Sequence, residues 1–263
     1  MKTSKCGGGL IYRIPQKDIE YIGYFPANAK KETVKNASPR IGKERGRAPD
    51  IICNAELFDF TTRKPASDVV HNGEVHRLTE GYGIAFPKNN SAVFSYKNNV
   101  GAKDYVGAYP VLVQTGIVKI GSTAPAGLGG ARGRTAIGTN AEELYIALIP
   151  DGAGVQLRTL ASALKNAGAA NAINLDGGGS TQYYAPNANY FSSRPVRGFI
   201  AIWLKGEYRT VNVRTSLNIR AGAGITYKKI GSYKNGTKVK IIEEKLGWAR
   251  TPDGWVSSIY LKK

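Results

Sequence analysis

Apolar residues in this chain come mostly in short runs bounded by glycine, proline or polar residues, a pattern typical of strands. Seven strands are predicted in the first 205 residues, at 10–14, 51–54, 82–86, 111–113, 143–149, 171–175 and 199–204. Helical spacing occurs at 32–36 and 156–167, and Gly168 supplies a C-terminal stop for the second segment. The pattern therefore predicts a sheet-rich protein with few helices.

The order of three of these elements predicts where polar groups gather. Strand 143–149, helix 156–167 and strand 171–175 form a βαβ unit, in which functional groups collect at the carboxyl ends of the strands. Asp151 and Asp176 follow those two ends. Several other strands are joined too tightly for helical crossovers, so we predict an α+β domain with a mixed sheet.

The sequence changes character after the apolar strand at 199–204. Four short strands are predicted beyond it, with glycine-containing turns and no helix between them, at 216–220, 237–242, 248–250 and 254–257. Such spacing is typical of a small all-β barrel. We therefore predict two domains, residues 1–205 and 206–263.

The chain is strongly basic, and the charge is unevenly distributed. The formal net charge is +18, and residues 208–263 hold 12 Lys or Arg against 3 acids. Such a charge attracts polyanions: a nucleic acid, an anionic membrane or a phosphate-bearing wall polymer. No run of consecutive basic residues marks a nucleic-acid arm, so we rank nucleic acid below a wall or glycan polymer.

The N-terminus and the cysteines restrict the setting. Residues 1–9 contain no apolar stretch long enough for a signal peptide, and no membrane span is expected elsewhere. We therefore expect a cytoplasmic protein that acts at the cell wall after release, for example by lysis if it is phage-encoded. Cys53 is expected to be buried and Cys6 exposed, and neither has the spacing of a metal site.

The segment 171–181 carries the most specific chemistry. Its strand ends in Asp176, followed by three glycines and then by Ser180 and Thr181. Glycines allow backbone angles and close approaches that a side chain would forbid, so this turn exposes amide donors beside one carboxylate. The glycines lack the spacing and the lysine of a phosphate-binding P-loop. Asp176 has two interpretations: a functional acid, or a cap for its own turn.

Several motifs in order resemble the phosphodiester glycosidase family. The motifs are Asn54-Ala-Glu-Leu-Phe-Asp59, Pro110 to Gly116, Arg134-Thr-Ala-Ile-Gly138, Ile149-Pro-Asp-Gly152, Asn171 to Thr181 and Arg194-Pro-Val196. Together they span roughly residues 50 to 205, and several motifs in the right order are more specific than one glycine triplet. The family usually has a glycine where Glu56 stands.

This resemblance implies a site that cleaves a sugar-1-phosphodiester. Positive charge develops on the sugar and negative charge on the departing phosphate, so carboxylates and cations are needed together. We predict Arg134 as the main phosphate ligand, because its planar fork binds two oxygens, and Arg194 as a second. Asp176 is the predicted acid, as base, nucleophile or stabiliser. Glu56 is the predicted second carboxylate, with Asp59 as an alternative.

Other polar groups around the turn are predicted to bind substrate. The amides of Gly178 and Gly179 and the hydroxyls of Ser180 and Thr181 form a predicted phosphate nest. Asn54 and Asn174 are predicted to hydrogen-bond sugar hydroxyls or an acetamido group, and a purely structural role for Asn174 stays open. The sequence requires no cofactor, and Asp176 with another carboxylate could hold a divalent cation.

The tail resembles a bacterial SH3 domain. The similar segments are Leu217-Asn-Ile-Arg220, Gly236-Thr-Lys238, Gly247-Trp248 and Gly254-Trp-Val256. The resemblance implies attachment to peptidoglycan or another cell-wall polymer. Packing within the barrel is the favoured role for Trp248 and Trp255, whereas Tyr227, Tyr233 and Tyr260 are candidates for ligand contact.

Together these features predict a wall-targeted hydrolase. Its first domain would cleave a glycosyl-1-phosphodiester, such as one of N-acetylglucosamine-1-phosphate, in a bacterial envelope glycopolymer. Its second domain would hold it on that polymer. The alternatives are a non-enzymatic protein that binds wall or phosphosugar, and a binder of polyanions or nucleic acid.

Overall fold

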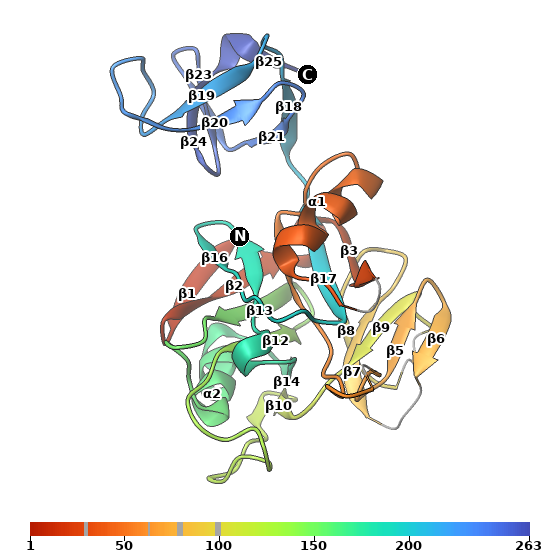
Figure 1. Cartoon of the computed structure of the whole chain (residues 1–263). Coiled ribbons are helices and arrows are strands. Elements are labelled where there is room, and N and C mark those ends of the chain that lie inside the picture. Colours follow the sequence, from red (N-terminus) through yellow and green to blue (C-terminus); the bar gives the residue numbers. More distant parts are fainter. Residues whose placement is uncertain (29–30, 63, 78–80, 98–100) are drawn as a thin grey trace. The chain divides into compact units, whose positions relative to one another are not determined.

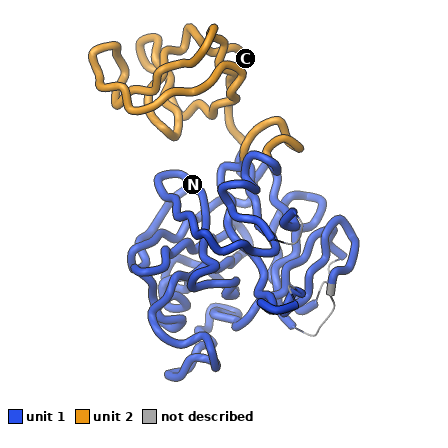
Figure 2. The backbone as a smooth tube through the Cα atoms, in the orientation of Figure 1, with its two compact units in different colours: residues 1–41, 49–204 blue, residues 42–48, 205–263 orange. Residues whose placement is uncertain are grey.

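A computed structural model describes residues 1–28, 31–62, 64–77, 81–97 and 101–263. The chain divides into two compact units (Figure 2). The first contains residues 1–41 and 49–204, and the second contains residues 42–48 and 205–263. Sequence analysis places the boundary after residue 205 and does not predict that the short segment 42–48 groups with the second unit.

The first unit contains three sheets, and every hydrogen-bonded pair of its described strands is antiparallel. The seven-stranded sheet has the order β1 (Lys2–Cys6), β2 (Gly9–Pro15), β13 (Glu143–Ile149), β12 (Arg134–Thr139), β14 (Asn171–Asn174), β10 (Val111–Gln114) and β11 (Ile117–Val118). One five-stranded sheet has the order β16 (Ala188–Tyr190), β15 (Tyr183–Ala185), β4 (Ile51–Asn54), β17 (Gly198–Leu204) and β3 (Ile19–Pro26). The other has the order β6 (Glu74–Arg77), β5 (Val69–His71), β9 (Asp104–Gly107), β7 (Tyr82–Phe86) and β8 (Val93–Tyr96).

The prediction of a mixed sheet is wrong, because β12 lies between β13 and β14, the two strands that run parallel. β13 and β14 each pair antiparallel with β12, so they run parallel to each other without touching. The carboxyl ends of β13 and β14 and the start of β12 consequently meet at one edge of the sheet. This edge carries Arg134, Asp151 and Asp176.

The core of the first unit lies between the seven-stranded and the β4-containing five-stranded sheets. Side chains from both meet in one buried cluster that includes Ile137, Ile146, Ile173, Ile200 and Ile202. Helix α2 (Leu157–Ala167) packs its buried leucines on the outer face of the seven-stranded sheet (Figure 1). The β4-containing sheet covers one face of β13 and helix α2 covers the other, so β13 is buried on both faces. Its sequence is accordingly a nearly continuous apolar run.

The other α-helix, α1, differs from its prediction in its bounds. Helix α1 runs over Val34–Glu44, with Pro39 inside it, whereas the spacing predicts a helix at 32–36. Val34, Ala37 and Ile41 recur at helical spacing and pack against Phe199 and other residues of the β4-containing sheet. Neither of the α-helices found in the described residues is long and apolar enough to cross a membrane.

The N-terminal segment also corrects the sequence analysis. Cys6 is buried at the end of β1, not exposed, because β1 pairs with β2 and its last residue packs into the cluster beneath α2. Cys53 is fully buried in β4, as predicted. Both cysteines are free thiols.

The second unit consists of two antiparallel sheets around a small core, and no single closed barrel forms. One sheet has the order β21 (Lys238–Ile241), β18 (Glu207–Val211) and β25 (Leu261–Lys262). The other has the order β20 (Lys229–Lys234), β19 (Ser216–Arg220), β24 (Gly254–Ser257), β23 (Trp248–Thr251) and β22 (Glu243–Lys245). Their apolar faces meet at Val211, Leu217, Ile219, Val239, Ala249 and Val256. The four predicted strands of the tail are therefore present.

Candidate functional site

The turn after β14 holds Asp176 by its backbone as well as by its side chain. The Asp176 amide donates to the Ala55 carbonyl at 3.0 Å, and its own carbonyl accepts from Asn54 Nδ2 at 2.7 Å. Gly178 then adopts φ 57°, a left-handed conformation that favours glycine, and its amide donates to the Gly133 carbonyl. The glycines thus turn the chain sharply while fixing the acid at the sheet edge.

The Asp176 carboxyl is buried and only half satisfied. Its Oδ1 accepts from the Gly177 amide at 2.9 Å, whereas its Oδ2 is buried without a hydrogen-bond partner. Burial raises the pKa of Asp176 to about 6, against the opposing effects of the Ser180 hydroxyl, the Gly177 amide and the Arg194 charge. A carboxyl with this pKa exchanges protons near neutral pH, as a catalytic acid or base must.

Asp176 lines a cavity of about 470 Å³ together with basic and apolar side chains. Three arginines line it, Arg132, Arg134 and Arg194, and Asp151 is the second acid of the lining. Leu57 and Phe60 contribute the apolar part. The cavity therefore combines one carboxyl of raised pKa with several cations, an arrangement suited to an anionic substrate.

Arg194 lies directly on the glycine turn. Its Nη1 is 3.5 Å from Ser180 Oγ, and its guanidinium carbon lies 5.3 Å from the centre of the Phe60 ring. A Cβ added to Gly179 would come within 2.7 Å of that guanidinium carbon. A glycine at position 179 is thus what allows the arginine to approach the turn.

Arg134 is placed differently, because much of its guanidinium binds the protein itself. Nε donates to the Val155 carbonyl at 3.1 Å, and Nη2 donates to the carbonyls of Leu128 and Gly130 at 2.9 Å each. The side chain is 2% exposed. Arg134 therefore holds the wall of the cavity, and among the described residues its Nη1 forms no hydrogen bond that would keep it from an anion.

Asn54 links the two sheets behind the site. Its Oδ1 accepts from Thr135 Oγ1 at 2.8 Å and from the Gln182 amide at 3.1 Å, while its Nδ2 donates to Asp176. It is fully buried and does not line the cavity. Its polar atoms position Asp176, and the predicted contact of Asn54 with a sugar stays a prediction.

Comparison with protein families supplies the identity of the fold. The model of the phosphodiester glycosidase family matches residues 49–203, more than half of the chain. This chain belongs to the phosphodiester glycosidase family. Residues 215–262 match the bacterial SH3 domain. Both predicted resemblances are therefore confirmed.

Solved structures show the same fold at low identity. The catalytic domain of zebrafish N-acetylglucosamine-1-phosphodiester alpha-N-acetylglucosaminidase, auto-inhibited by its pro-peptide, is 18% identical with a TM-score of 0.58, covering 75% of this chain and 77% of that one. A hypothetical protein from Synechocystis is 14% identical with a TM-score of 0.55, covering 78% of this chain and 61% of that one. Comparison with curated proteins finds no match.

Glu56 lies behind the cavity instead of in it. It is 1% exposed, and its Oε1 accepts from the Tyr24 hydroxyl at 2.7 Å and lies 3.5 Å from Arg197 Nε. Burial raises the pKa of Glu56, and the charge of Asp176 adds to the shift. Glu56 is absent from the lining of the cavity, and its predicted action on the substrate stays a prediction.

Asp59 does not replace Glu56 as a second carboxylate. Its Oδ1 accepts from the amides of Thr61 and Thr62 and from the Thr62 hydroxyl, and these hydrogen bonds lower its pKa. Asp59 thus stabilises its own exposed turn. The second acid in the cavity is Asp151, whose Oδ1 accepts from the Gly133 amide at 2.8 Å. This hydrogen bond gives Asp151 a structural role in the turn after β13.

The predicted phosphate nest is formed only in part. Gly178 and Gly179 line the cavity, but the Gly178 amide is already bound to Gly133. Ser180 and Thr181 are fully buried outside the lining, so neither hydroxyl faces a ligand there. Of these predicted groups, the Gly179 amide lines the cavity without a backbone partner among the described residues.

Asn174 does line the cavity, and one of its atoms is unpaired. Its Nδ2 donates to the carbonyls of Tyr109 and Leu175, while its Oδ1 is buried without a partner. The nitrogen of Asn174 thus has the structural role, and its hydrogen bond to a sugar stays a prediction. Arg132 and Phe60 also line the cavity, and sequence analysis does not predict either of them. The only sequence signal for Arg132 is its position two residues before Arg134.

The SH3 unit contains a cavity of its own of about 520 Å³. Trp248, Tyr260, Ile225 and Ile259 contribute its large apolar side chains. Tyr260 is therefore placed as a ligand-contacting tyrosine would be, whereas the Tyr233 hydroxyl is bonded to Thr251 and Asp253. Trp248 lines the cavity although packing was its predicted role. In the residues that the structure describes, no group of His, Cys, Asp and Glu is arranged to hold a metal ion.

Proposed function

We propose that this protein hydrolyses a glycosyl-1-phosphodiester in a bacterial envelope glycopolymer, on which its SH3 unit holds it. An N-acetylglucosamine-1-phosphate linkage is the expected bond. The observation that carries the proposal is the buried Asp176 carboxyl, with a pKa of about 6, in a cavity lined by three arginines. The family and the name of the zebrafish neighbour support the choice of reaction.

In the proposed step, water attacks the anomeric carbon. The bond between this carbon and the phosphate oxygen breaks, and its electron pair goes to the departing phosphate monoester. Asp176, ionised above pH 6, stabilises the positive charge on the sugar and accepts the proton of the attacking water. Arg194 and the free Nη1 of Arg134 stabilise the phosphate, whose negative charge grows as it leaves. No second catalytic carboxylate is needed for the leaving group, since phosphate departs as a stable anion.

Sugar release from a panel of phosphodiesters tests the reaction. The panel holds a methyl phosphodiester of N-acetylglucosamine-1-phosphate, UDP-N-acetylglucosamine and a wall polymer with sugar-1-phosphate links. Asp176→Asn is expected to lower kcat about 10²- to 10⁴-fold, the usual contribution of a general base. Glu142→Gln is the matched control, because Glu142 is exposed and lies far from the lining.

The result separates hydrolysis from binding alone. If the folded protein releases no sugar from any member of the panel, the hydrolase proposal fails. If it then binds the phosphosugars with micromolar affinity, it is a phosphosugar-binding protein. Full activity of Asp176→Asn would leave hydrolysis in place and remove Asp176 from the mechanism.

Wall attachment is tested separately, on the SH3 unit of the full chain. Tyr260→Ala should reduce sedimentation with purified cell walls, because Tyr260 lines the cavity of this unit and is 45% exposed. Tyr227→Ala is the control, since Tyr227 is 52% exposed but lies outside that lining. Equal sedimentation of both variants and the unmodified protein would exclude this cavity as the wall-binding site.

A further inference from the structure

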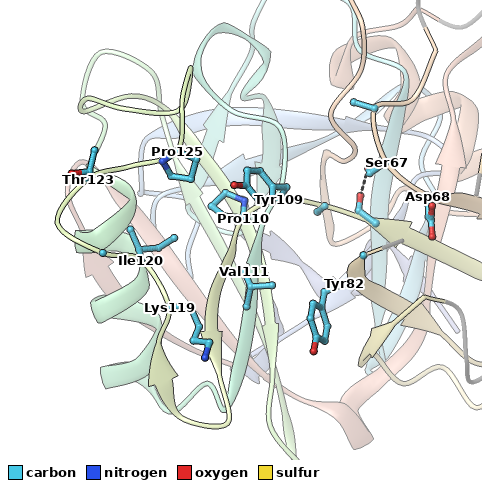
Figure 3. A pocket seen from close by; sticks show the side chains of 15 residues that line it. Ser67, Asp68, Tyr82, Tyr109, Pro110, Val111, Lys119, Ile120, Thr123 and Pro125 are labelled. Carbon is cyan, nitrogen blue, oxygen red and sulfur yellow. Dashed lines mark hydrogen bonds between the residues drawn. The ribbon is translucent and has the colours of Figure 1, made fainter. Parts of the chain in front are cut away.

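The first unit has a second cavity, of about 510 Å³, whose lining side chains are drawn in Figure 3. Strands β7 and β10 contribute Tyr82 and Val111 to its lining, and the segment after β11 contributes Lys119. Its volume lies within the roughly 300–1,000 Å³ range of ligand sites. The proposed hydrolysis does not use Tyr82, Tyr109 or Lys119, the aromatic and basic residues of this lining.

The two cavities share one wall. Tyr109 and Pro110 line the second cavity, and Asn174 lines the first. The Tyr109 amide donates to the Asn174 carbonyl at 3.2 Å, and Asn174 Nδ2 donates back to the Tyr109 carbonyl at 3.1 Å. A ligand that occupied both cavities would therefore cross this contact between Tyr109 and Asn174. Asn174 Oδ1 is buried at the contact without a hydrogen-bond partner.

The aromatic wall of the second cavity is rigid. The Tyr82 ring stacks on Phe94, with centroids 5.0 Å apart and planes 11° apart, and meets the edge of Tyr96 at 5.1 Å. Tyr109 adds a second ring, 55% exposed. A partly exposed ring held in place by neighbouring rings, with a second and more exposed ring in the same lining, suits the apolar faces of sugar rings, because little entropy of the Tyr82 side chain is lost on contact.

The charge of the lining selects the kind of glycan. Its two charged residues are Asp68 and Lys119. Asp68 is 2% exposed, whereas Lys119 is exposed and forms no ion pair within the described residues. A cation opposite tyrosines favours a glycan that carries phosphate over a neutral one. Figure 3 shows Lys119 and Tyr82 on different segments of the lining.

We propose that this second cavity binds the sugar-phosphate units next to the one being cleaved, so that the substrate is an oligomeric or polymeric phosphodiester glycan. The inference rests on the proposed function, since it extends the substrate of the Asp176 site. The occupant follows from the shared wall, the two tyrosines of the lining and the exposed lysine. A neutral peptidoglycan fragment should bind there much more weakly.

Kinetics with two substrates test the proposal on the full chain. The substrates are the methyl phosphodiester of N-acetylglucosamine-1-phosphate and an oligomer of several sugar-1-phosphate units. Tyr82→Ala should lower the ratio of kcat/KM for the oligomer to kcat/KM for the methyl ester about tenfold, the scale of a central aromatic contact. Lys119→Ala should lower it less, and the exposed Lys165→Ala on α2 should leave it unchanged.

The affinity of the Asp176→Asn variant for the oligomer tests the second cavity without any hydrolysis. If no phosphodiester is cleaved, the proposed function fails, and the affinity of Asp176→Asn for the oligomer, with and without Tyr82→Ala, decides the cavity by itself. A tenfold weaker affinity supports the second site. An unchanged affinity overturns it, as does a kcat/KM ratio that Tyr82→Ala leaves at the unmodified value or an equal affinity for the peptidoglycan fragment.

Discussion

The two cavities of the glycosidase unit share the contact between Asn174 and Tyr109, yet their construction is opposite. The first is formed by a glycine turn and strand ends, and it contains a buried carboxyl with an unpaired oxygen and three arginines. The second is formed by strand faces and the segment after β11, and it presents stacked rings and one exposed lysine. The first stores electrostatic energy in groups removed from water, whereas the second offers preformed contact area.

This difference indicates how the fold separates chemistry from recognition. Strand ends and glycines can bring charged groups together at close range, because the backbone there is free to turn. Strand faces hold rings at fixed spacing and suit contact with a repeated ligand. Changes to the first cavity should therefore affect rate and stability strongly, and changes to the second should affect substrate preference more mildly.

The largest expected effect concerns the stability of the first cavity. The pKa of Asp176 is about 6 in the folded protein and 3.8 in its ordinary state, so its ionisation destabilises the fold as pH rises through this window. The cost at pH 7 is about 3 kcal/mol, from about 1.4 kcal/mol for each unit. Asp176→Asn should thus be more stable than the unmodified protein at pH 7, and the gain should vanish below pH 4. Denaturant unfolding at both pH values measures this, and an equal gain at pH 4 contradicts it.

The pH dependence of hydrolysis should also report the ionisation of Asp176. Because Asp176 must be ionised to accept a proton, kcat/KM should fall about tenfold for each unit below pH 6, or about hundredfold at pH 4. Binding of the oligomer by Asp176→Asn, which lacks this group, should change far less across the range. Initial rates from pH 4 to pH 8 provide the measurement. A rate that rises as pH falls below 6 would assign the opposite, acidic role.

Two glycine substitutions compare the cavities directly. Gly179→Ala should lower kcat/KM about tenfold, since the added Cβ displaces the Arg194 guanidinium and weakens a charge-assisted contact with phosphate. Gly121→Ala in the second cavity is the matched control, because its Cβ would meet nothing within 4 Å. Steady-state kinetics on the methyl ester measure both. Equal losses would show that the close approach of Arg194 to the turn is irrelevant.

The smallest expected effect is the salt dependence of the second cavity. Exposed charges are screened at high ionic strength. The affinity of Asp176→Asn for the oligomer should fall as NaCl rises, and Lys119→Ala should lower affinity about threefold at low salt and hardly at all at 1 M, where the Debye length is about 3 Å. Titration calorimetry at both salt concentrations measures the difference. A loss from Lys119→Ala that persists at 1 M salt would show that the lysine acts by packing instead of charge.

Local sequence patterns predict the strands with clear apolar runs and miss those defined by their partners. The strands at 51–54, 82–86 and 143–149 are found with the predicted bounds. β12 is not predicted, because Ala136 and Ile137 are its only apolar residues apart from Gly138. It becomes a strand by pairing on one side with β13 and on the other with β14. Its insertion changes the predicted mixed sheet into an antiparallel one. β3 is missed for a similar reason, since it pairs with β17 over its whole length.

The candidate site was predictable in its centre and not in its surroundings. Strand order places Asp176 and Asp151 at one edge, and the arginine motif adds Arg134 to the same edge. Whether a polar side chain faces a cavity or the interior depends on residues far along the chain. Thr135 and Gln182 donate hydrogen bonds to Asn54, and Tyr24 donates one to Glu56. No spacing within the motif 54–59 encodes those contacts.

The sequence by itself determined the family, the SH3 tail, the main strands and the acid at the glycine turn, because these depend on motifs and on local periodicity. The tertiary structure alone decided which polar groups reach solvent. Asp176 is buried enough for its pKa to be raised, and Glu56 lies behind the cavity. Most of the Arg134 guanidinium donates to backbone carbonyls. The tertiary structure also placed the second cavity beside Asn174. The physical reason is that burial and pairing are set by contacts with other segments of the chain, such as Glu56 with Tyr24, 32 positions away, and Asn54 with Asp176, 122 positions away.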